Sequence, residues 1–431
     1  MQTRPDSTHV QTLPNGVRVL TIQQPQAAGA SVSVFVRSGS QHESARSNGI
    51  SHVIEHMAFK GTTTRDCQQI NLDAERLGAE VNAHTDRDHT AYQMRGLAQH
   101  TRPFIRMLAD LVLNPTFPEA ELERERQVIL HELTDLEDDA YAVAYRLFDQ
   151  ASYGTHAFAR PVIGSRLNIQ RFDRAALIAH VAARYSGSNL IVGVIGPLDA
   201  QAVADEVSAC FGHLEAGTPN QVDAPDWQGG VRIRRHSGSS QSQVVLGWPI
   251  AGLGAGAGAS ATDACAQMAA AVLGEGMSSP LLDQIRERLG LAYHVSVSAD
   301  QLELGGQFVI EAATASEHLD DFLAETLRLL HDQAARVTPV DLERAHNQLT
   351  VRQLHVLERP LRRLEDAALD LFALGRVRSQ AELAQALGQV TAEQVREQFE
   401  QMLRRPAALA VTGKVKAGLR ERWQERLGAA L

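Results

Sequence analysis

The sequence predicts an α+β protein of two similar domains, each a mostly antiparallel β-sheet flanked by α-helices. Runs of β-branched and apolar residues that predict strands follow one another directly, and runs with helical spacing come after them. This order favours α+β over a doubly wound fold. An internal repeat points to the duplication. The composition, with 44% hydrophobic and 21% charged residues over 431 positions, is that of a globular protein with room for two or three domains.

The repeat is visible in two helical segments and in the apolar runs downstream of them. "FPEAELERERQVI" around Pro118 resembles "VTPVDLERAHNQL" around Pro339, 221 positions later, and the same shift places Ile169 opposite Val390. Further along, "LIVGVIGPLD" resembles "ALAVTGKVKA", each an apolar run that ends in Gly. We interpret the two halves as copies of one unit.

A linker separates the copies. The stretch from Glu215 to Gly230 is rich in Gly, Pro and Asp and has neither helical nor strand periodicity. We therefore expect a first domain over residues 1–215, a linker over 216–230 and a second domain over 231–431.

Individual elements follow from hydrophobic periodicity and from the Gly, Pro and Asn residues that bound it. We expect strands over residues 16–25 and 30–40, a strand–turn–strand over 81–94, and helices over 49–60, 102–115, 119–137 and 319–334.

Charge and composition exclude several classes of protein. A net charge of −10 argues against nucleic acid as a partner, because phosphate binding needs clustered Lys and Arg.

The uncharged run Val244–Thr262 holds too many glycines for a membrane span, so a strand and a glycine loop are expected. The first 17 residues lack the apolar core of a secretory signal. Cys67, Cys210 and Cys265 have no metal-binding spacing and suggest buried thiols in a reducing compartment. We expect a cytoplasmic protein with no membrane partner.

The stretch "SNGISHVIEHMAFKGTTT" contains the candidate metal-binding residues. Ser47 and Asn48 are suited to cap a helix that ends before Gly61. On that helix His52 and His56 lie four residues apart and point the same way, with Glu55 beside them. Two neutral imidazoles can supply two corners of a zinc tetrahedron, a carboxylate a third and water the fourth. Alternatively, two polar histidines simply face solvent.

The spacing of the residues does not identify the third metal ligand. The helix expected over 119–137 has Leu122, Ile129, Leu133 and Leu136 on one stripe, and Glu125 and Glu132, two turns apart, lie together at its margin. One of them could bind a metal while the other supports a ligand, and spacing does not choose between them. His84 and His89 are five apart, have opposite parity on a strand, and are not expected to share a face.

These blocks resemble the pitrilysin-type zinc metallopeptidases, with the H-x-x-E-H signature, especially mitochondrial processing peptidase and its half-size bacterial relatives. "GISHVIEHMAFKGT", "GAEVNAHTDRDHTAYQM" and "ERERQVILHEL" come in the same order as in that family. The resemblance implies that His52, His56 and Glu132 bind one zinc ion per chain. It implies further that Glu125 supports the site and that Glu55 is the general base.

The second half resembles the family too. "LLDQIRERLGLAYHVSVS" is similar to an R-x(6)-Y element, which maps to Arg286 and Tyr293 and implies substrate holding and polarisation of the scissile carbonyl. In the family, an edge strand of the first half pairs with the peptide backbone, and this strand maps to Asn82 and Ala83. The alternatives without a catalytic role are a helix-terminal arginine and a core tyrosine. Departures from the family pattern are Glu275 and Pro280 near a glycine loop, and His84 where an aromatic residue is common.

The resemblance implies a zinc-dependent endopeptidase that hydrolyses short or unfolded peptides inside a chamber formed by two chains. Glu55 would take a proton from the attacking water, whose pKa zinc lowers from 15.7 to about 7. A homodimer is expected, and a heterodimer with an inactive relative remains an alternative. The rival functions are a non-catalytic scaffold of the same fold, as in the core subunits of the respiratory bc1 complex, and a structural zinc protein.

Overall fold

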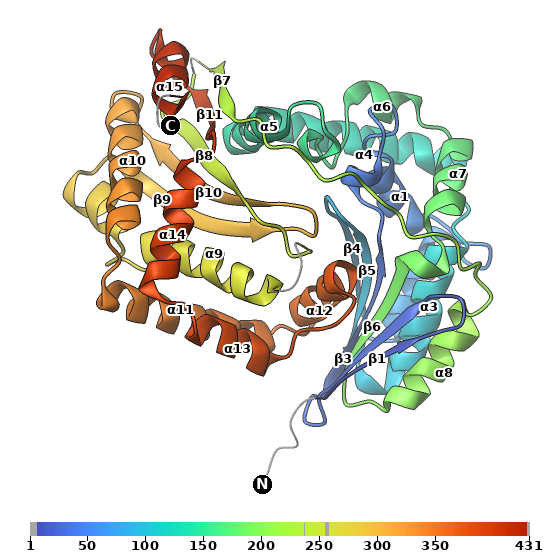
Figure 1. Ribbon diagram of the computed structural model, residues 1–431. Coiled ribbons are helices and arrows are strands. Elements are labelled where there is room, and N and C mark those ends of the chain that lie inside the picture. Colours follow the sequence, from blue (N-terminus) through green and yellow to red (C-terminus); the bar gives the residue numbers. More distant parts are fainter. Residues whose placement is uncertain (1–6, 237, 255–257, 429–431) are drawn as a thin grey trace. The chain divides into compact units, whose positions relative to one another are not determined.

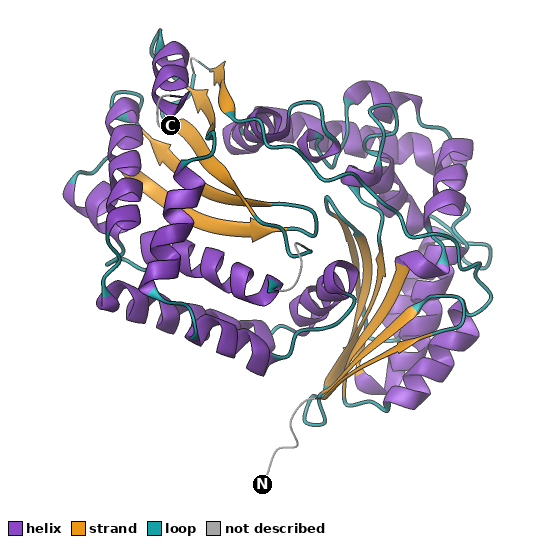
Figure 2. Ribbon diagram, in the orientation of Figure 1, coloured by secondary structure: helices purple, strands orange, loops and turns teal. Residues whose placement is uncertain are grey.

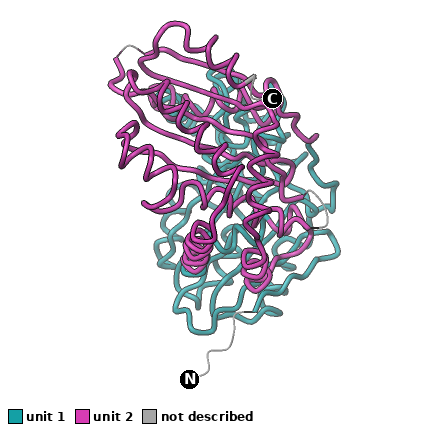
Figure 3. The backbone as a smooth tube through the Cα atoms, turned by 60° about the vertical axis from the view of Figure 1, so that its left-hand side comes forward, with its two compact units in different colours: residues 1–134, 160–222, 357–369 teal, residues 135–159, 223–356, 370–431 magenta. Residues whose placement is uncertain are grey.

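The computed structural model describes residues 7–236, 238–254 and 258–428. Residues 1–6, on which part of the expectation about a secretory signal falls, lie outside this description, as do residues 255–257 of the expected glycine loop. The described chain forms two compact units, coloured separately in Figure 3. The first comprises residues 1–134, 160–222 and 357–369, and the second comprises residues 135–159, 223–356 and 370–431.

A six-stranded sheet forms the centre of the first unit, in the order β1-β2-β6-β3-β5-β4. Only the β2–β6 pair is parallel among its described strands. Helices α3 and α8 pack on the sheet, against β3, β5 and β2 (Figure 1). The strands are β1 (Ser7–Thr12), β2 (Arg18–Gln23), β3 (Gly29–Val36), β4 (Glu80–Thr85), β5 (Thr90–Leu97) and β6 (Leu190–Gly196).

The helices of the first unit come in groups, between runs of these strands and after the last one. They are α1 (Ile50–Ala58), α2 (Cys67–Arg76), α3 (Thr101–Leu113), α4 (Glu119–Asp138), α6 (Arg166–Arg171), α7 (Arg174–Arg184) and α8 (Ala200–Phe211), with short helical turns η1 (Ser40–His42), η2 (Ala98–His100) and η4 (Gly187–Asn189).

The second unit repeats this plan. Its five-stranded sheet has the order β7-β11-β8-β10-β9, with β7–β11 parallel and the other pairs antiparallel. Strand for strand, this is the order of the first sheet without β1, which supports the duplication seen in the sequence. Both sheets are mostly antiparallel and carry helices (Figure 2), so the predicted fold class is confirmed. The strands are β7 (Gly230–Arg235), β8 (Ser242–Ile250), β9 (Ala292–Gln301), β10 (Gly306–Thr314) and β11 (Ala408–Gly413).

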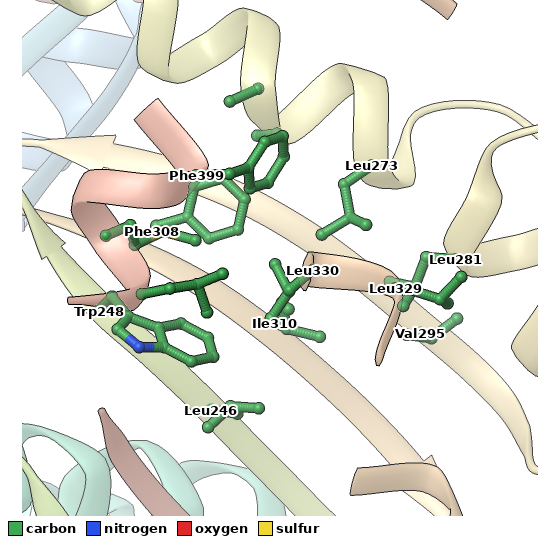
Figure 4. Packing of buried hydrophobic residues seen from close by; sticks show 14 of the residues in the cluster. Leu246, Trp248, Leu273, Leu281, Val295, Phe308, Ile310, Leu329, Leu330 and Phe399 are labelled. Carbon is green, nitrogen blue, oxygen red and sulfur yellow. The ribbon is translucent and has the colours of Figure 1, made fainter. Parts of the chain in front are cut away.

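The core of the second unit lies between its sheet and helices, where Trp248, Phe308 and Phe399 are fully buried (Figure 4). Burying aromatic rings of this size contributes about 2–3 kcal/mol each before entropy is counted.

The helical elements of the second unit are α5 (Ala140–Tyr153), η3 (Ala157–Ala159), α9 (Ala259–Gly274), η5 (Leu282–Arg288), α10 (Leu319–Ala335), α11 (Pro339–Leu357), α13 (Gln380–Gly388), α14 (Ala392–Leu403) and α15 (Leu419–Gly428). Helix α12 (Pro360–Leu374) begins in the first unit and ends in the second.

Each unit takes a helix from the other half of the sequence. Helix α5 follows the first-half helix α4, yet it packs on β7, β8 and β11 of the second sheet. The first part of α12, from the second half, belongs to the first unit. There Leu364 approaches β6 so closely that a Cβ atom on Gly193 would come within 2.6 Å of its methyl group. The units are therefore not continuous in sequence.

The expected strands and helices all occur, with ends shifted by a few residues. Residues 215–229 contain no helix or strand. The three cysteines are free and half-buried. Among the described residues, no helix combines the length and the apolar composition needed to cross a bilayer.

Two details of the prediction are wrong. Leu136 is 42% exposed, because α4 passes out of the first unit after Thr134 and the apolar stripe no longer faces the core. His84 and His89 do meet, with ring centroids 5.5 Å apart. The parity rule fails because the chain reverses between them, so that His84 lies near the end of β4 and His89 lies just before β5.

Candidate metal centre

Helix α1 is held at its start by a residue outside the helix. Its N-cap is Gly49, which has φ of 98° and packs so closely that a Cβ atom would lie 2.8 Å from the Cα atom of Gly164. The carboxylate of Glu43 accepts hydrogen bonds from the backbone N–H groups of Gly49 (2.7 Å) and Ser51 (2.9 Å). The expected side-chain caps are not used, because Asn48 instead donates its amide to Glu43.

One face of α1 is buried and the other carries polar groups. Ile50, Val53, Ile54 and Met57 are at most 3% exposed, as their helical spacing predicts. Their burial fixes the rotation of the helix, so His52, Glu55 and His56 are held on the opposite face. The two imidazole rings lie with centroids 4.7 Å apart.

Helix α4 brings the third group to this pair. The Oε2 atom of Glu132 lies 3.5 Å from Nε2 of His56 and 3.9 Å from Nε2 of His52. The edge of a zinc tetrahedron with bonds of about 2.0–2.1 Å is about 3.3–3.4 Å long. Two imidazole nitrogens and a carboxylate oxygen thus surround one point at nearly the spacing of zinc ligands, and they fit the ion.

The neighbouring carboxylate lies on the other side of His56. Oε2 of Glu125 is 3.1 Å from Nδ1 of His56, and its Oε1 is 2.7 Å from Nζ of Lys60. Burial opposes the charge on Glu125, but the hydrogen bonds from Lys60 and His56 hold its pKa below the usual range. An ionised carboxylate can only accept, so Nδ1 of His56 carries the proton and Nε2 is left to bind a metal.

The protonation of His52 also suits metal binding. Burial, and to a lesser degree the neighbouring His56, lowers the pKa of His52 to about 4. A neutral imidazole is the form that coordinates a metal.

Glu55 lies on the same face of α1 and is not part of the ligand triangle. Its Oε2 accepts a hydrogen bond of 2.7 Å from the hydroxyl of Thr85, at the end of β4. Burial raises the pKa of Glu55 above the usual carboxylate value, while Thr85 and His56 oppose the shift. A carboxylate with a raised pKa, oriented by one hydrogen bond, is suited to take up and release a proton.

Strand β4, which carries Asn82 and Ala83, lies at one edge of the first sheet. It is the last strand of the first sheet, so one side of it has no partner strand among the described residues. Asn82 and Ala83 lie in its middle, and Asn82 is exposed. An extended peptide could add there as a further strand.

Arg286 and Tyr293 belong to the second unit. Arg286 lies in the helical segment η5, and its guanidinium carbon is 5.6 Å from the ring centroid of Tyr293. Tyr293 is 79% exposed on β9, the edge strand of the second sheet. The alternative of a core tyrosine is therefore wrong.

Comparison with known proteins fits these features. Residues 18–166 match the family model described as "Insulinase (Peptidase family M16)", and residues 171–349 match "Peptidase M16 inactive domain". An "uncharacterized zinc protease" of Mycobacterium bovis is 30% identical over 408 residues, covering 93% of this chain and 92% of that protein. The chain belongs to peptidase family M16.

Two further proteins are also similar to this chain. The probable mitochondrial-processing peptidase subunit beta of Schizosaccharomyces pombe is 33% identical over 208 residues, which cover 48% of this chain and 46% of that protein. A crystal structure of a protease from Helicobacter pylori shares the fold, with a TM-score of 0.85 at 20% identity over 95% of this chain and 100% of that one. The resemblance seen in the sequence is confirmed.

Two of the three departures from the M16 pattern, Glu275 and His84, pair with other side chains. Glu275 ends α9, and its carboxylate lies 3.6 Å from a guanidinium nitrogen of Arg352. Pro280 stands just before η5. His84 has its Nε2 atom 3.0 Å from Oε1 of Glu365, in α12.

Several contributors to this M16 site have no sequence signal that we recognised. Glu43 lies six positions before the Gly49 that it caps, and Lys60 comes after the histidines and pairs with Glu125. Thr85 is 30 positions from the Glu55 that it contacts. A carboxylate shortly before an otherwise uncapped helix start is the one signal that could have been found, because helix N–H groups need acceptors.

Proposed function

We propose that this chain is a zinc-dependent endopeptidase. The observation that carries the proposal is the convergence of His52, His56 and Glu132 on one point in a chain whose relatives are zinc proteases. In this proposal those three residues hold one zinc ion, and Glu125 fixes His56 through its Nδ1 proton. Zinc in such a site acts as a Lewis acid that polarises a carbonyl and makes water more acidic.

The chain's own residues carry the proton and position the peptide. Glu55 takes a proton from the attacking water and delivers it to the departing nitrogen, and Thr85 keeps its carboxylate in place. A peptide adds to β4 alongside Asn82 and Ala83. Arg286 and Tyr293 donate hydrogen bonds to the carbonyl oxygen as negative charge develops there.

We infer further that short or unfolded peptides are the substrates and that two chains enclose them. In a homodimer, Arg286 and Tyr293 of one chain would complete the zinc site of its partner. A heterodimer with an inactive relative is the alternative assembly. We propose a cytoplasmic location with no nucleic acid or membrane partner, in keeping with the acidic charge and the unpaired cysteines.

The test is cleavage of an unstructured peptide library by the full chain, followed by mass spectrometry of the products. We expect internal cleavage that stops with a chelator and returns with zinc. Failure to cleave by a chain shown to contain zinc would favour the scaffold function. Retained cleavage after complete zinc removal would reject the metal mechanism.

Sharing of the site between two chains has its own test. Glu55→Gln chains mixed with Tyr293→Phe chains should recover part of the activity that each lacks alone. Inactivity of the mixture, with both variants folded and dimeric, would contradict the shared site.

A further inference from the structure

A second group of histidines and carboxylates lies in the first unit, formed by His84, Asp86, His89 and Glu365. Their nearest ligand atoms all lie within 4.8 Å of one another. Oε1 of Glu365 is 3.0 Å from Nε2 of His84 and 3.4 Å from Nε2 of His89. Oδ2 of Asp86 is 3.9 Å from Nε2 of His84. These distances are similar to those among His52, His56 and Glu132, and they lie near the edge of a zinc tetrahedron.

The orientation of His89 points to a ligand at this place. His89 is 1% exposed, and its Nε2 atom has no hydrogen-bond partner although it faces the group. On the other side of the ring, Nδ1 lies 2.7 Å from Oδ1 of Asp88. A histidine that gives its Nδ1 proton to a carboxylate and presents Nε2 is the arrangement that metal-binding histidines commonly have.

Backbone contacts hold the turn that carries three of these residues. The carbonyl oxygens of Asp86 and Arg87 accept hydrogen bonds from the N–H groups of Ser40 and Gln41, and the N–H of Asp86 donates to the carbonyl oxygen of His89. The fourth residue, Glu365, comes from α12, whose Leu364 packs on the first sheet. The group is therefore preorganised by backbone and core.

Charge near the group favours a cation. Asp86, Asp88 and Glu365 supply three carboxylates, while Arg362 lies 3.6 Å from the other oxygen of Glu365, Oε2. The Oε1 atom of Glu365 therefore faces the two histidines.

We propose that His84, His89 and Glu365, with Asp86 or water in the fourth position, form a second zinc site, separate from the His52–His56–Glu132 centre. A site of two imidazoles and carboxylates binds zinc in preference to calcium or magnesium. The ion would tie α12 to the hairpin of β4 and β5. Thr85 of that hairpin contacts Glu55, so the second ion would stabilise the position of the strand beside the first site.

The test counts zinc ions bound to the full chain after complete removal of metal and titration with zinc. We expect two ions per wild-type chain, one in the His52→Ala/His56→Ala double variant and one in Glu365→Gln. The second ion should bind at least on the order of 100-fold more weakly in Glu365→Gln. Asp366→Asn changes the next carboxylate of α12, which pairs with Arg362, and should leave two ions.

His84→Phe provides a second variant in case Glu365→Gln does not fold, because His84 is only half-buried and an aromatic ring can occupy its place. It too should bind one ion, with an unchanged circular dichroism spectrum. Cobalt bound to the His52→Ala/His56→Ala variant should show the intense visible bands of a four-coordinate ion.

One zinc in the wild type together with one in Glu365→Gln would overturn the second site and leave the first intact. An unchanged count in His52→Ala/His56→Ala would instead overturn the proposed catalytic centre. The two proposals therefore fail in different ways.

Discussion

Nδ1 of His56 lies 3.1 Å from Oε2 of Glu125, and this contact determines which nitrogen of His56 is free. Glu125→Gln removes the charged acceptor while keeping the shape of the side chain. We expect zinc to bind 10- to 100-fold more weakly, as is typical when the partner of a metal-binding histidine is lost. Competition with a chromogenic chelator measures the affinity. Glu119→Gln, at the exposed start of the same helix, is the matched control, and equal affinities in both variants would contradict the role of Glu125.

Glu55→Gln should separate metal binding from turnover. Because Glu55 lies outside the ligand triangle, the variant should keep its zinc, while loss of the general base should lower kcat by about 10²–10⁴-fold. Metal content and peptide cleavage are measured on the same sample, with Glu119→Gln again as control. A zinc-loaded Glu55→Gln enzyme with normal kcat would rule out the assigned role.

Glu43→Ala should loosen the start of α1. The side chain is 4% exposed and accepts hydrogen bonds from two backbone N–H groups and from Asn48. Leaving these buried donors without an acceptor should cost about 2–4 kcal/mol of the free energy of unfolding. Urea unfolding of the metal-free chain measures it, with Glu75→Ala, on the exposed surface of α2, as control. Equal unfolding midpoints for the two variants would show that Glu43 is not the cap.

His42 should make the metal-free protein sensitive to acid. It is 7% exposed, and its Nδ1 accepts a hydrogen bond from the N–H of Gly39. Burial, followed by the charges of Arg184 and Arg37, lowers its pKa to about 3. The unfolded chain binds this proton near pH 6.5, so stability is fully present above that pH and falls as the pH decreases toward 3.

At pH 5 the loss due to His42 should be about 2 kcal/mol relative to pH 7. Urea unfolding at both pH values measures it. His42→Gln should be less sensitive to the change, whereas His213→Gln, at an exposed position of the same unit, should behave like the wild type. Identical pH dependence in His42→Gln and the wild type would contradict the assignment.

Local features of this fold could be predicted from the sequence because they depend on neighbours in the chain. The apolar stripe of α1 fixes which way His52 and His56 point, and the spacing of Glu125 and Glu132 puts both on one margin of α4. The choice between those two glutamates could not be made from periodicity. It depends on which side of His56 each carboxylate meets, and that is set by the packing of α4 against α1.

Contacts between distant segments could not be predicted from periodicity. Glu365 reaches His84 across 281 positions, because α12 joins a unit formed mostly by the first half of the chain. The rule that residues five apart on a strand face opposite ways does not hold across a turn, so the meeting of His84 and His89 was also missed. Side-chain periodicity describes one element at a time and gives no information on which elements pack together.

The most direct test of the central claim is a crystal structure of the zinc-loaded chain with anomalous diffraction data collected at the zinc absorption edge. We predict a peak about 2.0–2.2 Å from Nε2 of His52, Nε2 of His56 and a carboxylate oxygen of Glu132. A fully loaded crystal without a peak among these three residues would contradict the assigned metal centre and the peptidase mechanism that depends on it.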